Sequence, residues 1–585
     1  MILPERKVMI PAPKSVQMRK ETPTMKKNSM LRLTGLVCSL ALMLGTFAGC
    51  GSKSDSAAST GSTAPADSQP TQVSQVPEQP AADTAASTPE DSAAAEKVEI
   101  PSIFPLDDTA TLTMFYPWSP RFVQLGYDSP NDFNFYSNLE KMTNVHIDFT
   151  ATGADVVQEK FQLMMATQDY TDMFFNCLDY YSGGITKAIE DEAFIDLSSY
   201  TDLMPNYVAL MDQNAEFKKA NYTDEGQLGQ FLSYGKNVTL TQGFAIRQDW
   251  LDTLNLEKPE TYDQWYDVLV AFKNEYNLDN AMMEKTPTSG FYCADEQNGY
   301  YIQDGKVHYF WTDTDMAKEY LELTKKWYDA GLFTASALVD NGITDSEQRQ
   351  MKIDGSSGIF KVDIDDVGFY NGGNMGTPEG YAITGLANPV KNAGDTPYGI
   401  IRQESYSNGM TVSSACSDID LTVQWLDNFY TDDVILLANY GIEGDTFTYD
   451  DQGQPHFTDK VLQDEDGLNM ALFKYVMDWG PCVLDWSRKN DAYDDVQQEC
   501  LEIWTDRNID GAYPSFATYT TEESSEVAAV WTDIDTYVDE NIPKFITGDK
   551  DLADYEAFVD TLNEMGVPTI LDCRQAAYER YLERG

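Results

Sequence analysis

The chain is poor in basic residues and in histidine. Its 585 residues include 95 Asp and Glu against 40 Lys and Arg, a formal net charge of −55, and only 3 His. Nucleic acid is excluded as the main partner, because phosphate binding needs clustered Lys and Arg. A globally disordered chain is excluded too, because 42% apolar and 12% aromatic residues are enough to bury cores. At roughly 150 residues per domain, more than one lobe is expected.

The short motifs of common enzymes and metal sites are also missing. There is no H-E-x-x-H, no G-x-S-x-G and no complete phosphate loop. The 8 Cys form no C-x-x-C pair, so no zinc site is expected. Two acid-rich runs, 450–454 and 363–366, lack the spacing of a calcium loop and are interpreted as turns. The sequence therefore predicts no catalytic residue, no metal and no cofactor.

The first 49 residues differ from the rest in charge. They carry eight basic and two acidic residues, so residues 50–585 have a net charge of −61. Met25-Lys26-Lys27 precedes an apolar run, 33–47, which is the pattern of a secretory signal. The alternative is a transmembrane helix, but only 17 residues separate Arg32 from Cys50, near the lower limit for spanning. Either Met1 or Met25 is the translation start.

The end of this leader, Ala48-Gly49-Cys50, resembles the lipobox of bacterial lipoproteins. The resemblance implies that Cys50 is diacylated and anchors the protein to the outer face of the cell membrane. Residues 51–96 contain no aromatic residue and are mostly Ser, Ala, Thr, Pro, Gln and Asp. Such a segment cannot bury enough surface to fold, so 50–96 is predicted to be a lipid-bearing tether with a reach of roughly 40 Å.

The body that follows has alternating strand and helix patterns. Strands are predicted at 111–116, 145–149 and 173–175, separated by helices at 133–143 and 156–166. This order implies βαβ units and a mainly parallel sheet, hence an α/β fold. Further on, Thr261 and Gln264 have the spacing of a capping box. A helical apolar stripe follows them, formed by Trp265, Val268, Leu269 and Phe272.

Aromatic and polar residues follow two of the predicted strands. Trp118 and Arg121 follow the first strand, and Asp179, Tyr180 and Tyr181 follow the third. In open α/β sheets, ligands bind outside the carboxyl ends of the strands, and aromatic rings stack on the apolar faces of sugars. These five residues are therefore candidate ligand contacts; the alternative is that their rings pack a core between lobes. Because Trp118 lies at a strand end between two prolines, its loss is expected to weaken sugar binding without unfolding the body.

Six segments, in order along the chain, resemble the extracellular solute-binding proteins of family 1, in particular the long LipO-like lipoproteins. They are Val145–Phe149, Ile246–Leu251, Tyr262–Leu269, Lys326–Leu332, Asn439–Gly444 and Gln575–Tyr581. The family usually has a glycine where this chain has Asn255, a residue that also tolerates the left-handed end of a helix. The Gly- and Asn-rich region 355–411 is interpreted as loops and short strands of the kind that often carry binding groups.

The resemblance implies a periplasmic-binding-protein type II fold, with two α/β lobes and a hinge that close on a ligand. It places residues 97–238 and 410–455 in the first lobe, and 239–409 and 456–585 in the second. It implies a monomeric receptor that delivers a carbohydrate, most often an oligosaccharide, to the permease of an ABC importer. Arg247, after a strand near the hinge, either faces the cleft or pairs with Asp249. The rival functions are a secreted glycoside hydrolase, since 93 acids offer many carboxylate pairs, and a peptide receptor of the same fold.

Overall fold

The structure, a computed structural model, describes nine stretches of the chain. They are residues 102–119, 122–123, 125–154, 156–292, 299–339, 345–373, 376–399, 405–477 and 480–584. The predicted leader, Cys50 and the predicted tether lie outside these stretches, as do Arg121 and Cys293. The described elements belong to one compact unit, Ala94–Gly585. Its five described cysteines, at 177, 416, 482, 500 and 573, are free thiols.

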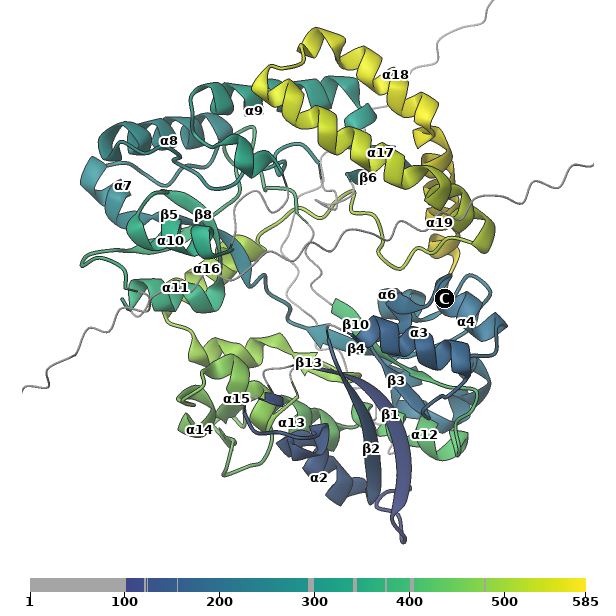
Figure 1. Ribbon diagram of the computed structural model, residues 1–585. Coiled ribbons are helices and arrows are strands. Elements are labelled where there is room, and N and C mark those ends of the chain that lie inside the picture. The colour runs from purple at the N-terminus through teal and green to yellow at the C-terminus, as the bar shows by residue number, and fades with distance from the viewer. Residues whose placement is uncertain are drawn as a thin grey trace, which may run out of the picture. The chain divides into compact units, whose positions relative to one another are not determined.

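Six strands form the first sheet, in the order β13-β4-β10-β3-β1-β2 (Figure 1). They are β1 (Ala110–Trp118), β2 (Val145–Gly153), β3 (Met173–Phe175), β4 (Phe231–Lys236), β10 (Ser405–Val412) and β13 (Val483–Asp485). β1 pairs in parallel with β2 and β3, and β4 in parallel with β13, whereas β10 is antiparallel to β3 and β4. All strands except β10 therefore run in one direction. The predicted mainly parallel sheet and its first three strands are confirmed.

Helices and a hairpin accompany the first sheet. The helices are α2 (Asn134–Thr143), α3 (Val157–Thr167), α4 (Gly184–Glu190), α5 (Pro205–Gln213), α6 (Ala215–Asn221), α12 (Ile419–Asp427), α13 (Asp432–Tyr440), α14 (Asp459–Leu462) and α15 (Leu468–Tyr475). The hairpin is β11 (Phe447–Tyr449) and β12 (Pro455–Phe457). The apolar faces of the sheet and several of these helices meet in one core, which includes Met114, Leu139, Trp425 and Leu437.

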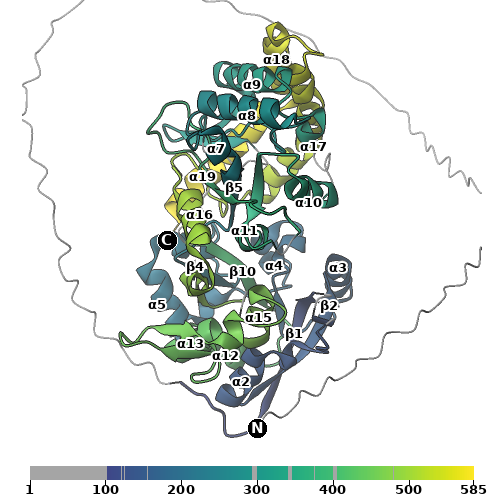
Figure 2. The ribbon, with the colours of Figure 1, turned by 90° about the vertical axis from the view of Figure 1, so that its left-hand side faces the viewer.

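A second, smaller sheet has the order β8-β5-β9, with β5 antiparallel to both neighbours. Its strands are β5 (Gln242–Arg247), β8 (Ile359–Asp363) and β9 (Ile383–Leu386), and a hairpin, β6 (Tyr300–Gln303) and β7 (Lys306–Tyr309), lies elsewhere in this part. The helices here are α7 (Gln248–Leu254), α8 (Tyr262–Tyr276), α9 (Thr314–Asp329), α10 (Asp345–Asp354), α11 (Ile364–Asn371), α16 (Asp495–Thr505), α17 (Thr521–Thr547), α18 (Tyr555–Met565) and α19 (Val567–Glu583). Figure 2 shows α8, α9 and α18 grouped at one end of the molecule.

Local signals in the sequence correctly placed several helix ends. The Thr261 side chain accepts a hydrogen bond from the Gln264 backbone, and the Gln264 side chain accepts one from the Thr261 backbone. This capping box starts α8. The predicted stripe of α8 is buried in the second core. Asn255 ends α7 with a φ of 54°, the left-handed conformation expected for this helix end.

The boundary between the lobes differs from the prediction in the second half of the chain. The sequence assigned 456–585 to the second lobe, but Met477, Cys482 and Leu484 lie in the first core and β13 pairs with β4. The chain therefore crosses between the sheets at 237–241, between β9 and β10, and at 486–494. The third crossing was missed because β13 has only three residues, too few to show a period, and its partner β4 lies about 250 residues earlier.

One buried carboxylate in the first lobe makes stability depend on pH. Asp427 accepts hydrogen bonds from the Asn206 and Tyr207 backbone at the start of α5, and burial outweighs these bonds and raises its pKa from 3.8 to about 6. The folded state therefore binds this proton more tightly than the unfolded state does. The stabilisation from this proton is complete well below pH 3.8 and is lost as the pH rises through about 6.

We expect Asp427→Asn to remove this pH dependence. The difference in free energy of unfolding between the wild type and the variant should fall by about 2 kcal/mol between pH 4 and pH 7, since one pKa unit corresponds to about 1.4 kcal/mol. Urea unfolding of both proteins across this range measures it. A difference that does not change with pH would contradict the assignment.

Candidate functional site

The carboxyl ends of five parallel strands define one edge of the first sheet. These ends are Trp118, Gly153, Phe175, Lys236 and Asp485, because β1, β2, β3, β4 and β13 run in one direction. Two of the three crossings to the second sheet, 237–241 and 486–494, start at this edge. Ligands of open α/β sheets bind outside such an edge, so we take it as the candidate site.

Trp118 ends β1 at this edge, as predicted, but its ring belongs to the core of the first lobe. The side chain is only 8% exposed. Its ring lies 5.0 Å from the Phe122 ring and stacks on Phe133 at 5.7 Å. The ring is thus packed in the core, with Phe133 against one face and Phe122 meeting it edge-on. In this structure Trp118 therefore follows the alternative that the sequence left open, packing in a core, whereas Arg121 lies outside the described residues.

The segment after β3 is more accessible. Asp179 is exposed, and Tyr180 and Tyr181 are half-buried at the end of a short 3-10 helix, Leu178–Tyr180. One side of each tyrosine rests on a small apolar cluster: the Tyr180 ring lies 6.1 Å from Phe161, and the Tyr181 ring lies 6.1 Å from Phe194. These three residues therefore combine partly open rings with a free carboxylate at the candidate edge.

Tyr181 is held in place by a hydrogen bond. Its hydroxyl donates to Asp191 Oδ2 at 3.0 Å. Burial, followed by this bond, raises the pKa of Tyr181 to about 12, so the hydroxyl keeps its proton at neutral pH. A neutral ring with a fixed orientation is suited to stacking and not to acid–base chemistry.

Arg247 lies at the far end of the second sheet and is fully engaged. β5 starts at Gln242, next to the crossing (or linker) at 237–241. Arg247 lies five residues further on, roughly 17 Å along the strand. Its Nε and Nη2 donate to the two oxygens of Asp249 at 2.8 and 2.6 Å. The guanidinium also lies between the Trp250 and Tyr381 rings, 4.3 and 4.1 Å from their centroids. Of the two alternatives left by the sequence, the structure shows the pair with Asp249.

Polar contacts connect two of the linkers at the candidate edge. Asp485 accepts hydrogen bonds from Asn237 Nδ2 at 3.0 Å and from the Ser487 hydroxyl at 2.6 Å, and Lys236 Nζ lies 3.6 Å away. Burial works against the charge of Asp485, but these partners outweigh it and lower its pKa. The carboxylate therefore stays charged and fixes the first linker to the third.

A second group of aromatic side chains at this edge was missed by the sequence analysis. Tyr406, near the start of β10, stacks on Tyr234 at 6.0 Å and lies 6.1 Å from Phe516, in the loop between α16 and α17. Tyr406 is half-buried. The region 355–411 was flagged as a carrier of binding groups, but no local pattern pairs Tyr406 with a residue 110 positions later.

Each histidine has a structural partner. His146 pairs with Glu140, His308 stacks on Tyr301, and His456 pairs with Asp491 at 2.6 Å. The predicted turn at 450–454 is present, since Asp450 accepts the backbone N–H of Gln452 and of Gln454. Among the residues that the structure describes, no group of three or more His, Cys, Asp or Glu is arranged to hold a metal ion.

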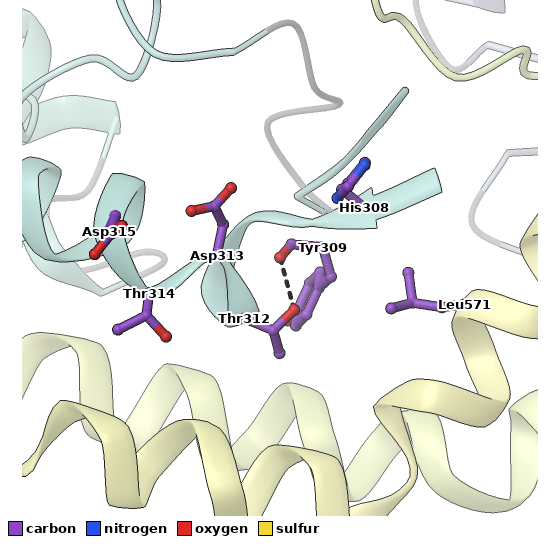
Figure 3. Close-up of a pocket in the computed structure, with 7 residues that line it drawn as sticks. All are labelled: His308, Tyr309, Thr312, Asp313, Thr314, Asp315 and Leu571. Carbon is purple, nitrogen blue, oxygen red and sulfur yellow. Dashed lines mark hydrogen bonds between the residues drawn. The ribbon is translucent and has the colours of Figure 1, made fainter. Parts of the chain in front are cut away.

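A hollow of about 370 Å³ lies in the helical part of the second lobe (Figure 3). His308, Asp313, Thr312 and Leu571 are among the residues around it. Its polar groups already have partners: Asp313 caps α9 and accepts the Tyr301 hydroxyl at 2.9 Å, and the Thr312 hydroxyl donates to Tyr309 O. The hollow could therefore enclose a small molecule, but few of its polar groups are free to bind one.

Two sheets joined by three crossings, with a mixed first sheet, give this chain the fold of the two-lobed solute-binding proteins. The alginate-binding protein AlgQ2 without calcium superposes with a TM-score of 0.62 at 21% identity, over 81% of this chain and 98% of that one. An oligosaccharide-binding solute-binding protein of Bifidobacterium longum infantis, associated with an ABC transporter, superposes with a TM-score of 0.64 at 17% identity, over 81% and 99%. The predicted fold class is confirmed.

The sequence is similar to that of ABC transporter substrate-binding proteins. The fructooligosaccharide-binding FusA of Streptococcus pneumoniae is 26% identical over 380 residues, which cover 58% of this chain and 65% of that protein. YtcQ of Bacillus subtilis, a polygalacturonan- and rhamnogalacturonan-binding protein, is 28% identical over 26% of this chain and 29% of its own length. Lipoprotein LipO of the same organism is 29% identical over similar shares. The resemblance to solute-binding proteins of family 1 is confirmed.

The matched regions span less than two thirds of these relatives' own length. No family model matches the chain. Within the described residues, no helix is both long and apolar enough to cross a membrane.

Proposed function

We propose that the protein is the substrate-binding component of an ABC importer and captures a neutral oligosaccharide between its two lobes. The observation that supports this most strongly is the similarity to a fructooligosaccharide-binding protein over 380 residues, on a fold that it shares with solved sugar-binding receptors. The partner of the loaded protein would be the importer's permease.

The proposed ligand contacts are Asp179, Tyr180 and Tyr181, with Arg121 retained from the sequence. The two rings supply stacking faces, and the exposed Asp179 carboxylate accepts hydrogen bonds from sugar hydroxyls. Trp118 and Arg247 are withdrawn from the site, because one is enclosed in a core and the other in an ion pair.

A thermal-melting screen of the full chain tests this function. Neutral oligosaccharides, uronic-acid oligosaccharides and peptides are added separately, because a ligand that binds only the folded state raises its stability by RT ln(1 + [L]/Kd). We expect a neutral oligosaccharide to raise the melting temperature. A response to peptides alone would show that the protein is a peptide receptor. New reducing ends in the sugar samples would show that it is a glycoside hydrolase.

Removal of either accessible tyrosine ring should weaken sugar binding. We expect Tyr180→Ala and Tyr181→Ala each to raise Kd about fivefold to tenfold, since one ring–sugar stack contributes about 1 kcal/mol. Calorimetry with the sugar found in the melting screen measures this. Tyr449→Ala is the matched control, because Tyr449 is 44% exposed on the β11–β12 hairpin. Equal affinities in all four proteins would remove both tyrosines from the site.

We further propose that the protein is held at the outer face of the cell membrane by a lipid on Cys50, through the tether at 51–96. The signal-like pattern before Cys50 and the similarity to lipoprotein LipO support this. We expect Cys50→Ser to move most of the protein from the membrane fraction into the medium. Immunoblots of the two fractions measure this, and retention of the variant at wild-type level would argue against the anchor.

A further inference from the structure

A tight turn of the first lobe presents one carboxylate toward the C-terminal helix. In residues 222–228, the Thr223 N–H donates to Gln227 O at 2.9 Å and the Gly226 N–H to Thr223 O at 3.0 Å. Gly226 has a φ of 77°, which only glycine adopts easily. Leu228 attaches this turn to the first core. Asp224 is thus held at the tip of a rigid turn.

Two arginines of the second lobe converge on this carboxylate. α19 packs in the second core through Val567 and Ile570, and its end lies beside α6 of the first lobe (Figure 1). Arg580 Nε donates to Asp224 Oδ2 and Arg584 Nε donates to Asp224 Oδ1, both at 2.6 Å. Each oxygen of the carboxylate therefore binds a different guanidinium.

The rest of each guanidinium is held by α17 and by the loop before it. Arg580 donates to both oxygens of Glu523 at 2.8 and 2.5 Å, and Arg584 donates to Phe516 O at 2.7 Å and to Thr518 Oγ1 at 2.5 Å. Arg580 therefore keeps a partner in its own lobe when Asp224 moves away, whereas the loop that holds Arg584 also packs against the first core through Phe516. The contact joins a carboxylate whose position is fixed by its turn to two guanidinium groups of the C-terminal region.

The contact is largely shielded from water. The side chain of Arg584 is 3% exposed and that of Asp224 is 11% exposed. Charge-assisted hydrogen bonds are stronger in such surroundings than at an exposed surface. The Tyr581 hydroxyl adds a bond to Glu216 of α6 at 3.2 Å. By contrast, another contact between the lobes, from Asn469 of α15 to Asp365 of α11, is exposed and has a neutral donor.

We propose that Asp224, Arg580 and Arg584 form a latch that holds the two lobes in the arrangement of this structure. The three linkers permit the lobes to move against each other, and the latch is a non-covalent restraint on that movement. The lobes separate at the Asp224 turn only when both charge-assisted bonds break. Release of the latch therefore precedes any large opening, and through it the exchange of the ligand assigned under the proposed function.

The distance between the lobes, measured without any sugar, tests the latch. Spin labels are placed in the full chain as noncanonical residues at Glu159 of α3 and Glu322 of α9, both exposed. Pulsed electron paramagnetic resonance gives the distribution of distances between the two labels. Asp224→Asn should raise the population outside the wild-type distance about tenfold, as expected for the loss of hydrogen bonds between charged groups.

Glu225→Gln is the matched control. It removes the same charge from the next position of the same turn, and Glu225 is exposed and makes no hydrogen bond or ion pair with the described residues. Its distances should equal those of the wild type. A distribution that is unchanged in Asp224→Asn would overturn the latch.

Arg584→Gln approaches the contact from the other lobe. Arg584 lies beyond the last residue of α19, so its replacement leaves that helix intact even if Asp224→Asn fails to fold. The latch predicts the same new distances for Arg584→Gln, and no further change in the double variant. Wild-type distances for Arg584→Gln would refute it. Because no sugar is present, the result is independent of whether the sugar screen succeeds.

Discussion

Trp118→Ala is expected to lower the free energy of unfolding by about 3 to 5 kcal/mol, the usual cost of replacing a buried large aromatic residue by alanine. The indole packs against Phe122 and Phe133, and Phe122 in turn lies 5.0 Å from Phe473, so the cavity would open in the middle of an aromatic cluster. Urea unfolding measures the loss. This expectation reverses the sequence prediction, in which the same change weakens sugar binding and leaves stability intact.

Trp118→Phe keeps an aromatic ring and is the control. It should lose less than half as much stability as the alanine variant, because most of the ring contacts remain. The folded fraction of both variants should bind sugar with wild-type affinity. Normal stability together with weak binding would return Trp118 to the ligand site.

Arg247→Met should cause the second largest loss of stability, lowering the free energy of unfolding by about 3 kcal/mol. It leaves Asp249 partly buried without its cation and removes the guanidinium from between two rings. Met preserves the length of the side chain, so the loss reports on charge and stacking more than on volume. Sugar affinity should not change, since Arg247 lies at the end of β5 remote from the linkers.

A double-mutant cycle with Asp249→Asn isolates the pair. The double variant should be clearly more stable than the sum of the single losses predicts, because neither partner is then left alone. Additive losses, or a selective loss of sugar affinity in Arg247→Met, would contradict the structural role.

Local patterns were reliable where one segment contains the whole cause. The capping box of α8 needs only Thr261 and Gln264, and the left-handed end of α7 needs only Asn255. The positions of β1, β2 and β3 along the chain were predicted from apolar runs separated by helical stripes. In each case the hydrogen bonds or the buried face arise within about ten residues of chain.

The packing of individual candidate side chains was not predictable where it depended on residues from other elements. Trp118 was placed at the correct edge of the sheet, but the ring that covers its face, Phe133, comes from the start of α2. Arg247 had Asp249 nearby in sequence, yet Tyr381, which encloses its other side, is 134 positions away. Burial of a side chain is decided by such partners, and a strand-end position alone does not reveal them.

The sequence by itself determined that this is an acidic α/β protein, because charge, periodicity and capping are properties of short segments. Only the tertiary structure decided which strand ends remain accessible, where the third linker lies, and that Asp224 meets Arg580 and Arg584. Those contacts join residues more than 350 positions apart. They exist because packing two cores brings the turn and the helix end together, and no local pattern encodes that proximity.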